Sequence, residues 1–82
     1  MNYAVIFTYS FDGDVAVYLF QDELSAKKFL RDSYEEELRI DKEENGLEVY
    51  GEISDDGWYA KIVDQFNDHE NVTEFRIGNI YS

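Results

Sequence analysis

The sequence predicts an α+β protein in which one main helix packs on an antiparallel sheet, in the order β-β-α-β-β-β. The composition is 44% hydrophobic and 17% aromatic, which is far too apolar for a disordered chain. Short β-branched and aromatic runs are separated by turn residues, as in a sheet. One apolar stripe at helical spacing predicts one helix with a single face to bury. The 82 residues allow a single domain, 1–82.

The first two elements are predicted to be a β-hairpin. Residues 2–9 (NYAVIFTY) are β-branched and aromatic, and both faces are largely apolar, so this strand should lie centrally in the sheet. Residues 10–14 contain Gly13 and read as a turn. Residues 15–20 (VAVYLF) form the second strand, and the short connection makes the pair antiparallel.

A helix is expected next. Asp22 is a good N-cap, and Glu23 in the first turn suits the helix dipole. The apolar stripe consists of Ala26, Phe29, Leu30 and Tyr34. The helix is expected to end near residue 36. Residues 37–42 stay open between helix and strand, because Leu38 and Ile40 share a face only on a strand.

The remaining chain is predicted to form three more strands. Residues 41–46 form a polar connection that ends in Asn45-Gly46, and strands follow at 47–54, 58–66 and 72–81. The Asp-Gly step within 55–57 predicts a hairpin, and 67–71 (NDHEN) a polar loop. Gly78 is expected to mark a bulge or a close backbone approach. The chain has no Pro, so its edge strands must be protected by charge.

Several classes of function find no support in the residues. There is no Cys, so no disulfide or thiolate metal site can form. The only His, His69, has no nucleophile motif to serve, and no phosphate-binding glycine motif is present. Acids bunch at Asp64, Asp68 and Glu70 without the spacing of a calcium loop. We therefore expect no enzyme activity, no catalytic, cofactor-binding or metal-binding residues, and no cofactor.

The predicted location is the cytoplasm. The apolar run at residues 3–9 is short, rich in hydroxyl groups and followed by acids, so it is interpreted as a strand and not a signal peptide. No apolar run approaches the roughly 20 residues that a membrane span needs. The absence of Cys suits a reducing compartment. No interaction with a membrane is expected.

The strongest functional signal is an acidic tract in residues 35–56. The chain has a net charge of −12, and in this tract ten acids oppose only Arg39 and Lys42, which gives −8. A small domain needs a net charge of only about 2–8 for solubility. The predicted partner-binding residues are Glu35, Glu36, Glu37, Asp41, Glu43, Glu44, Glu48, Glu52, Asp55 and Asp56.

Such a tract predicts a partner with a basic surface. A charge of −12 repels nucleic acid directly, so no direct binding of DNA or RNA is expected. A compact chain of this length is about 30 Å across, and about 30 Å of duplex holds roughly 18 charges. Carboxylates at that density could take the place of phosphates on a nucleic-acid-binding protein. Tyr50 or Trp58 could anchor the contact, although core or hairpin packing is the better expectation for Trp58.

In size, charge and lack of Cys the chain resembles the small acidic proteins of phages and mobile elements that inhibit host defences, including anti-restriction and anti-CRISPR proteins. The resemblance rests on the acidic stretch of residues 34–56, YEEELRIDKEENGLEVYGEISDD. It implies a bacterial or phage protein that mimics nucleic acid and inhibits a defence nuclease. The resemblance is to a class and contains no shared motif, so it carries over no individual residue.

A second interpretation remains open beside the first. The chain could be a generic interaction or accessory module, including a homodimer formed through an edge strand or an aromatic patch, whose acidity serves solubility alone. The two interpretations differ in their response to salt. A nucleic-acid mimic binds its partner less tightly as salt rises, whereas an apolar assembly tolerates salt.

Overall fold

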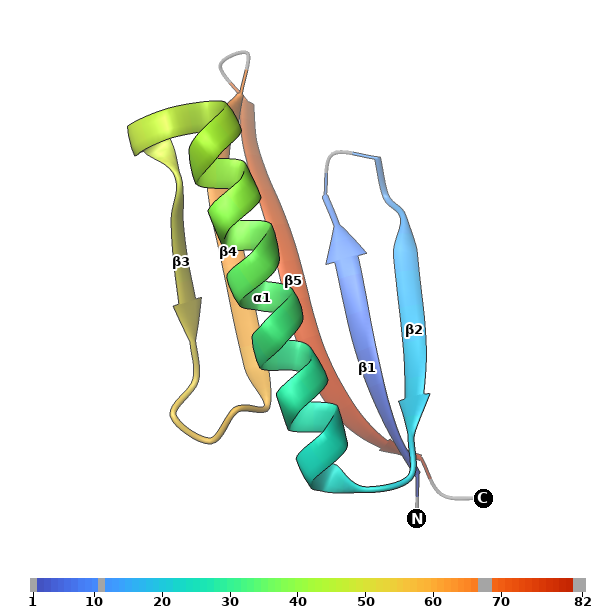
Figure 1. The fold of residues 1–82 in the computed structure, drawn as a ribbon. Helices are drawn as coiled ribbons and strands as arrows, with labels where there is room; N and C mark the ends of the chain where they lie inside the picture. Colours follow the sequence, from blue (N-terminus) through green and yellow to red (C-terminus); the bar gives the residue numbers. More distant parts are fainter. Residues whose placement is uncertain (1, 11, 67–68, 81–82) are drawn as a thin grey trace.

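The fold was analysed in a computed structural model that describes residues 2–10, 12–66 and 69–80. It has the predicted class, one helix on a five-stranded antiparallel sheet (Figure 1). The elements are β1 (Asn2–Tyr9), β2 (Val15–Phe20), α1 (Glu23–Asn45), the 3₁₀ helix η1 (Gly46–Glu48), β3 (Tyr50–Ile53), β4 (Tyr59–Phe66) and β5 (His69–Ile80).

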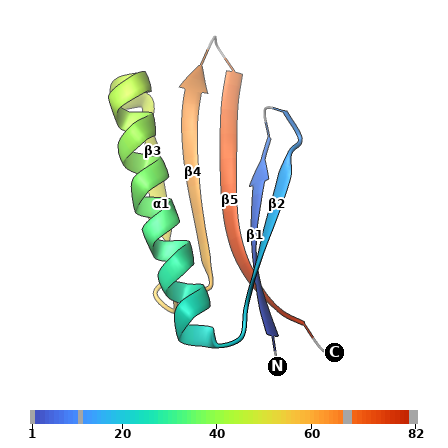
Figure 2. The same ribbon diagram turned by 45° about the vertical axis from the view of Figure 1, so that its right-hand side comes forward.

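The strands lie side by side in the order β2-β1-β5-β4-β3, and every neighbouring pair is antiparallel. β1 is an interior strand, as its two apolar faces predicted, while β2 and β3 are the edges. α1 runs diagonally across one face of the sheet (Figures 1 and 2). No described segment covers the opposite face, which is called the open face below.

The core lies between α1 and the central strands. Val5, Leu30 and Phe75 are fully buried, and they come from β1, α1 and β5. The rings of Phe7 and Phe75 meet edge to face with centroids 4.7 Å apart. On its other side Phe7 stacks on Phe29 of the helix at 5.7 Å. Phe75 therefore occupies the centre of the contact between the helix and the sheet.

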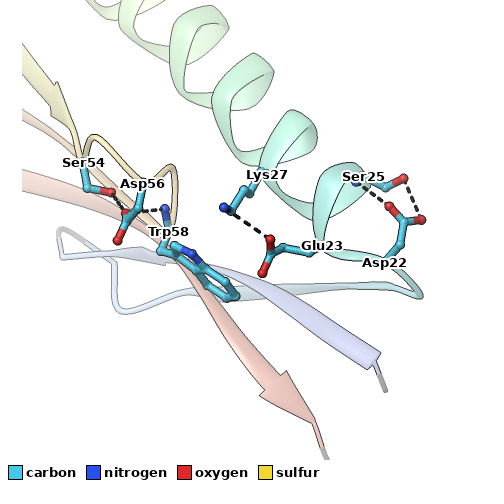
Figure 3. Close-up of polar contacts among 7 residues, drawn as sticks. All are labelled: Asp22, Glu23, Ser25, Lys27, Ser54, Asp56 and Trp58. Atoms are coloured by element: carbon cyan, nitrogen blue, oxygen red, sulfur yellow. Dashed lines mark hydrogen bonds and ion pairs between the residues drawn. The ribbon is translucent and has the colours of Figure 1, made fainter.

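The start of α1 agrees with the sequence prediction. The Asp22 carboxylate accepts the Ser25 backbone N–H at 2.7 Å and the Ser25 hydroxyl at 3.0 Å (Figure 3). These bonds satisfy a free donor of the first turn and lower the pKa of Asp22. Three residues of the predicted stripe, Ala26, Leu30 and Tyr34, are buried, and Phe29 is half-buried.

The end of α1 was predicted too early. Residues 37–42 are helical, and the expected connection at 41–46 is wrong because the helix continues to Asn45. Leu38 extends the apolar stripe onto the core, and Arg39 stabilises the extra turns through bonds to Glu36 and Glu43. The helix ends at Gly46, which takes a φ of 75° and donates its N–H to the carbonyl of Lys42.

The later strands also differ in their limits. The strand expected at 47–54 is confined to β3, since η1 takes up its first part. The loop expected at 67–71 is wrong for 69–71, which pair with β4, and the Asn71 amide donates to Asp64 at 3.0 Å. Residues 67–68 and 81 lie outside the described part. Gly78 marks neither a bulge nor a close approach: its register with Ala4 is continuous, and an added Cβ would meet no atom within 4 Å.

Gly51 in β3 allows the close approach of the helix. A Cβ at this position would lie 2.7 Å from Tyr34 Oη and 3.1 Å from Leu38 Cδ1. Tyr34 is buried, so its ring has little room to withdraw. We expect Gly51→Ala to lower the free energy of unfolding by about 1–3 kcal/mol through overpacking, measured by urea denaturation.

Gly78→Ala is the matched control for this substitution, because it adds the same methyl group to a strand where there is space for it. It should be neutral, or stabilising by about 0.5–1 kcal/mol through backbone entropy. Equal stabilities of the two variants would contradict the close-packing role of Gly51.

Candidate functional site

The predicted acidic residues lie on three consecutive elements and one turn. Six belong to the second half of α1, Glu48 lies on η1, Glu52 on β3, and Asp55 and Asp56 in the turn between β3 and β4. All ten side chains are exposed except Asp41, which is half-buried. We call the following group the acidic ridge: Glu35, Glu36, Glu37, Asp41, Glu43, Glu44 and Glu48.

The acidic ridge continues onto the neighbouring strand. The pKa of Tyr34 is raised chiefly by burial, and further by the charges of Glu35 and Glu52. Those two carboxylates therefore approach one tyrosine from α1 and from β3. Tyr50, also on β3, is 53% exposed and lies on the open face together with Glu52. Tyr50 therefore shares a face with Glu52, whereas α1 and its acids lie on the other face of the sheet.

Asp55 and Asp56 lie apart from the ridge, at the far end of β3 (Figure 1). They line a shallow depression beside the first half of α1, together with Leu24, Lys27, Lys28, Arg31 and Asp32. The helix side of this depression is basic, because Lys27, Lys28 and Arg31 line it. Eight of the ten predicted residues, the ridge and Glu52, therefore lie on the second half of α1, on η1 and on β3, and the other two lie apart from them.

Asp56 has a local structural role (Figure 3). Its Oδ1 accepts the Ser54 hydroxyl at 2.7 Å and the Trp58 backbone N–H at 3.1 Å. These bonds lower the pKa of Asp56 and hold the turn. Trp58 itself is half-buried, with Lys27 Nζ 5.2 Å from its ring and Tyr3 on another side. The tryptophan packs at the hairpin and is no anchor of the acidic ridge.

Part of the ridge is neutralised by exposed ion pairs. Arg39 reaches Glu36 at 2.8 Å and Glu43 at 3.1 Å, contacts that raise the pKa of Arg39. Beyond the ridge, Lys61 approaches Glu52 at 3.3 Å. Exposed pairs of this kind hold their partners weakly, with about 0–1 kcal/mol each. Within the described residues, no ion pair involves Glu35, Glu37, Glu44 or Glu48.

The structure adds acids that sequence reasoning assigned only to a turn. The pKa of Tyr9 is raised first by burial and then by the charge of Glu37, with smaller contributions from Asp12 and Asp14. Glu37 and the acids of the β1–β2 turn thus both act on Tyr9. The chain order contained part of this signal: a helix that starts where β2 ends and runs back along the sheet leads toward the end of the sheet that holds the β1–β2 turn.

The charges of α1 are uneven along its length. Residues 23–34 contain Lys27, Lys28 and Arg31 against Glu23 and Asp32, while residues 35–45 contain six acids against two bases. Glu23 in the first turn and Lys42 in the last turn suit the helix dipole. Glu43 and Glu44 in the last turn do not, and each is unfavourable by about 0.3–1 kcal/mol. The dipole therefore does not explain why these two acids end the helix.

Self-repulsion in the ridge predicts that salt stabilises the folded protein. The screening length falls from about 30 Å at 0.01 M to about 10 Å at 0.1 M ionic strength. We expect the thermal midpoint to rise over that range. Glu44→Lys is the control, because it replaces a negative by a positive charge in the last turn of α1. This variant should have a higher thermal midpoint at low salt and a weaker dependence of the midpoint on salt. A wild-type midpoint that is flat or falls with salt would contradict the repulsion.

Comparison with known proteins assigns the chain to no family, so it can be classified only by its fold. No protein-family model, no curated protein and no solved structure matches this chain. In the described part, no helix is long and apolar enough to cross a membrane. Nor do the described residues contain a group of three or more His, Asp or Glu placed to hold a metal ion. The class that the fold defines is a small, acidic α+β protein with one helix on a five-stranded antiparallel sheet.

Proposed function

We propose that the chain is a non-enzymatic binding protein whose acidic ridge occupies the nucleic-acid-binding surface of a basic partner protein. The observation that supports this most directly is the ridge itself. It concentrates exposed carboxylates on the second half of α1 and on η1, including Glu43 and Glu44 in the last turn, where the helix dipole disfavours them. Charge kept at the expense of stability suggests a role outside the fold.

The charge density of the ridge matches one strand of nucleic acid better than a duplex. Residues 35–48 hold seven acids and two bases, hence a net −5. At 1.5 Å per helical residue they extend over roughly 20 Å. Over about 20 Å a single strand carries about 6 phosphates and a duplex about 12. The ridge thus fits a groove that follows one backbone, such as the strand-binding channel of a nuclease.

Tyr50 fits the same role. It is 53% exposed at the β3 edge, close in sequence to Glu48 and Glu52. Aromatic residues beside a charged rim are common hot spots of protein interfaces. Channels for single strands combine basic residues with flat apolar surfaces on which bases stack. Tyr50 and Glu52, which share the open face at the β3 edge, would offer both features of the natural ligand, the base and the phosphate.

The defence nuclease of a bacterium is the partner we favour, with inhibition by occupation of its substrate groove. The test is affinity capture from nuclease-treated bacterial lysate, followed by elution with either a salt gradient or excess single-stranded DNA. Proteins that bind nucleic acid should elute at moderate salt, because the contact is screened like a phosphate contact. They should also elute with DNA at low salt, because DNA competes for the same groove.

A partner that resists both salt and DNA would contradict this function. It would favour the alternative, a generic interaction or accessory module in which the acids only maintain solubility. One observation does favour a further contact surface of that kind: β2 exposes a row of apolar side chains far from the ridge. That surface leads to a separate inference.

A further inference from the structure

The edge strand β2 is unprotected in a chain that otherwise carries charge on nearly every element. Its six residues, VAVYLF, include no charge and no Pro. On the open face Val15, Val17 and Leu19 are 60%, 55% and 66% exposed. Within the described part of the chain β2 pairs only with β1. The opposite edge, β3, is shorter and carries Glu52, which is the usual protection of an edge.

The backbone of β2 is also free on the side where another strand could pair. The Tyr9 N–H donates to the carbonyl of Asp14 at 3.1 Å, and the register between β1 and β2 continues from there without a break. Because bonded and non-bonded pairs alternate along an antiparallel ladder, residues 16, 18 and 20 bond to β1. The N–H and C=O groups of Val15, Val17 and Leu19 therefore point to the free edge.

We propose that β2 pairs antiparallel with β2 of a second copy of this chain, with Val17 opposite Val17 at a two-fold axis. In this register every residue whose backbone groups point to the free edge lies opposite another such residue: Val17 lies opposite Val17, and Val15 lies opposite Leu19. The pairing would form six backbone hydrogen bonds, since each copy contributes three N–H and three C=O groups. Strand addition of this kind is a common mode of protein association.

The side chains complement each other in the same register. On the open face the three exposed apolar residues of each copy form one continuous row with those of the other. On the helix face Tyr18, 43% exposed, would lie over Ala16 of the second copy, so a large residue meets a small one. A shift by one residue would place residues that bond to β1 opposite residues that point to the free edge, so it cannot form the ladder. A shift by two residues would use fewer of the outward-pointing residues of β2 than the proposed register.

Charge and area are both compatible with two copies. The open face carries Glu52, Glu70 and Glu74 against Lys61 and Arg76, so it holds only −1 of the chain's −12. The first half of α1 packs on β2, but the second half, which carries the ridge, packs on β3. The two ridges would therefore lie at least about five strand spacings or 24 Å apart, beyond the screening length of about 10 Å at 0.1 M salt. A six-residue edge buries on the order of 1,000 Å² in total, the lower limit of a stable interface. The dimer should therefore be reversible.

The two-fold pairing is closed, because it uses the β2 edge of both copies and leaves only the protected β3 edges outside. It produces a ten-stranded sheet with both helices on one face. The two acidic ridges would then face the same side. If the proposed function holds, this dimer would offer two sites to one partner assembly, but the dimer itself does not depend on that function.

The experiment is sedimentation equilibrium of the wild type, Val17→Lys and Leu24→Lys over a range of concentrations. Leu24 is the matched control: it is 80% exposed on α1, and it undergoes the same change of type and charge. The wild type and Leu24→Lys should dimerise, more tightly at higher salt because net charges repel. Val17→Lys should weaken the dimer at least about tenfold, since two ammonium groups would lie opposite each other.

A mixing experiment tests the register and guards against a folding defect. Val17→Lys and Val17→Glu should each be monomeric alone, with unchanged circular dichroism, and should form a mixed dimer when combined. A wild type that stays monomeric at every concentration overturns the proposal. So does a Val17→Lys protein that dimerises as tightly as Leu24→Lys, or a mixture of the two Val17 variants that stays monomeric. Salt weakens the proposed acidic contact and strengthens this dimer, so the failures of the two proposals are distinguishable.

Discussion

Phe75→Ala should lower the free energy of unfolding by about 3–5 kcal/mol, the largest loss that we expect from any single side chain. Phe75 is fully buried in β5, and its ring makes edge-on contacts with Phe7 at 4.7 Å and Tyr34 at 6.2 Å. Truncation leaves a cavity between the helix and the sheet, where both layers are fixed by their own hydrogen bonds. The change is measured by urea denaturation followed by circular dichroism.

The size of this effect is large relative to the total. A chain of 82 residues is expected to have a stability of roughly 4–12 kcal/mol. Phe75→Leu, which keeps most of the apolar volume, should cost clearly less than Phe75→Ala. Leu24→Ala serves as the control, because Leu24 is 80% exposed and its truncation should change stability by less than about 0.5 kcal/mol. A loss at Phe75 no larger than at Leu24 would contradict the core assigned here.

The sequence predicted the fold where local chemistry and periodicity agree. Asp22 is both a good cap and the observed cap, and Ala26, Leu30 and Tyr34 repeat at the spacing of a buried helix face. The β1–β2 hairpin followed from a short polar connection between two apolar runs. Each of these signals lies within a few residues, so no knowledge of distant contacts is needed to interpret it.

The errors occurred where tertiary contacts decide. Residues 41–45 are polar enough for a loop, yet Leu38 packs on the core and Gly46 supplies the actual stop. Residues 69–71 have loop composition, but pairing with β4 extends the strand through them. For the candidate site, the acidic tract could be recognised along the sequence. Its division into a ridge and a separate turn at Asp55 and Asp56 depends on the direction of β3, which composition does not contain.

Reversing Glu43, Glu44 and Glu48 to Lys should abolish partner binding and leave the fold intact. The substitution changes the ridge from −5 to +1, so lysines and arginines of the partner meet repulsion where they met carboxylates. Loss of three charge contacts at about 1 kcal/mol or more each predicts a loss of affinity of at least about 100-fold. The measurement is recovery, by the variant, of the proteins that the wild type captures from nuclease-treated lysate.

The fold should tolerate this reversal for a reason that the structure supplies. All three side chains are exposed, and within the described part of the chain the reversal breaks one ion pair, that between Arg39 and Glu43. Lysines in the last turn of α1 interact favourably with the helix dipole, where glutamates do not. The thermal midpoint of the triple variant should therefore equal or exceed that of the wild type at low salt.

The control for net charge is the triple variant Asp32→Lys, Asp55→Lys and Glu70→Lys. It makes the same change in total charge with exposed residues outside the ridge. If binding requires only a negative protein, both triple variants lose the partner equally. If it requires carboxylates on the second half of α1, only the ridge variant loses it. Full binding by the ridge variant would contradict the mimicry of a nucleic-acid strand, because the three reversed residues lie in the most acidic part of the chain, residues 35–56.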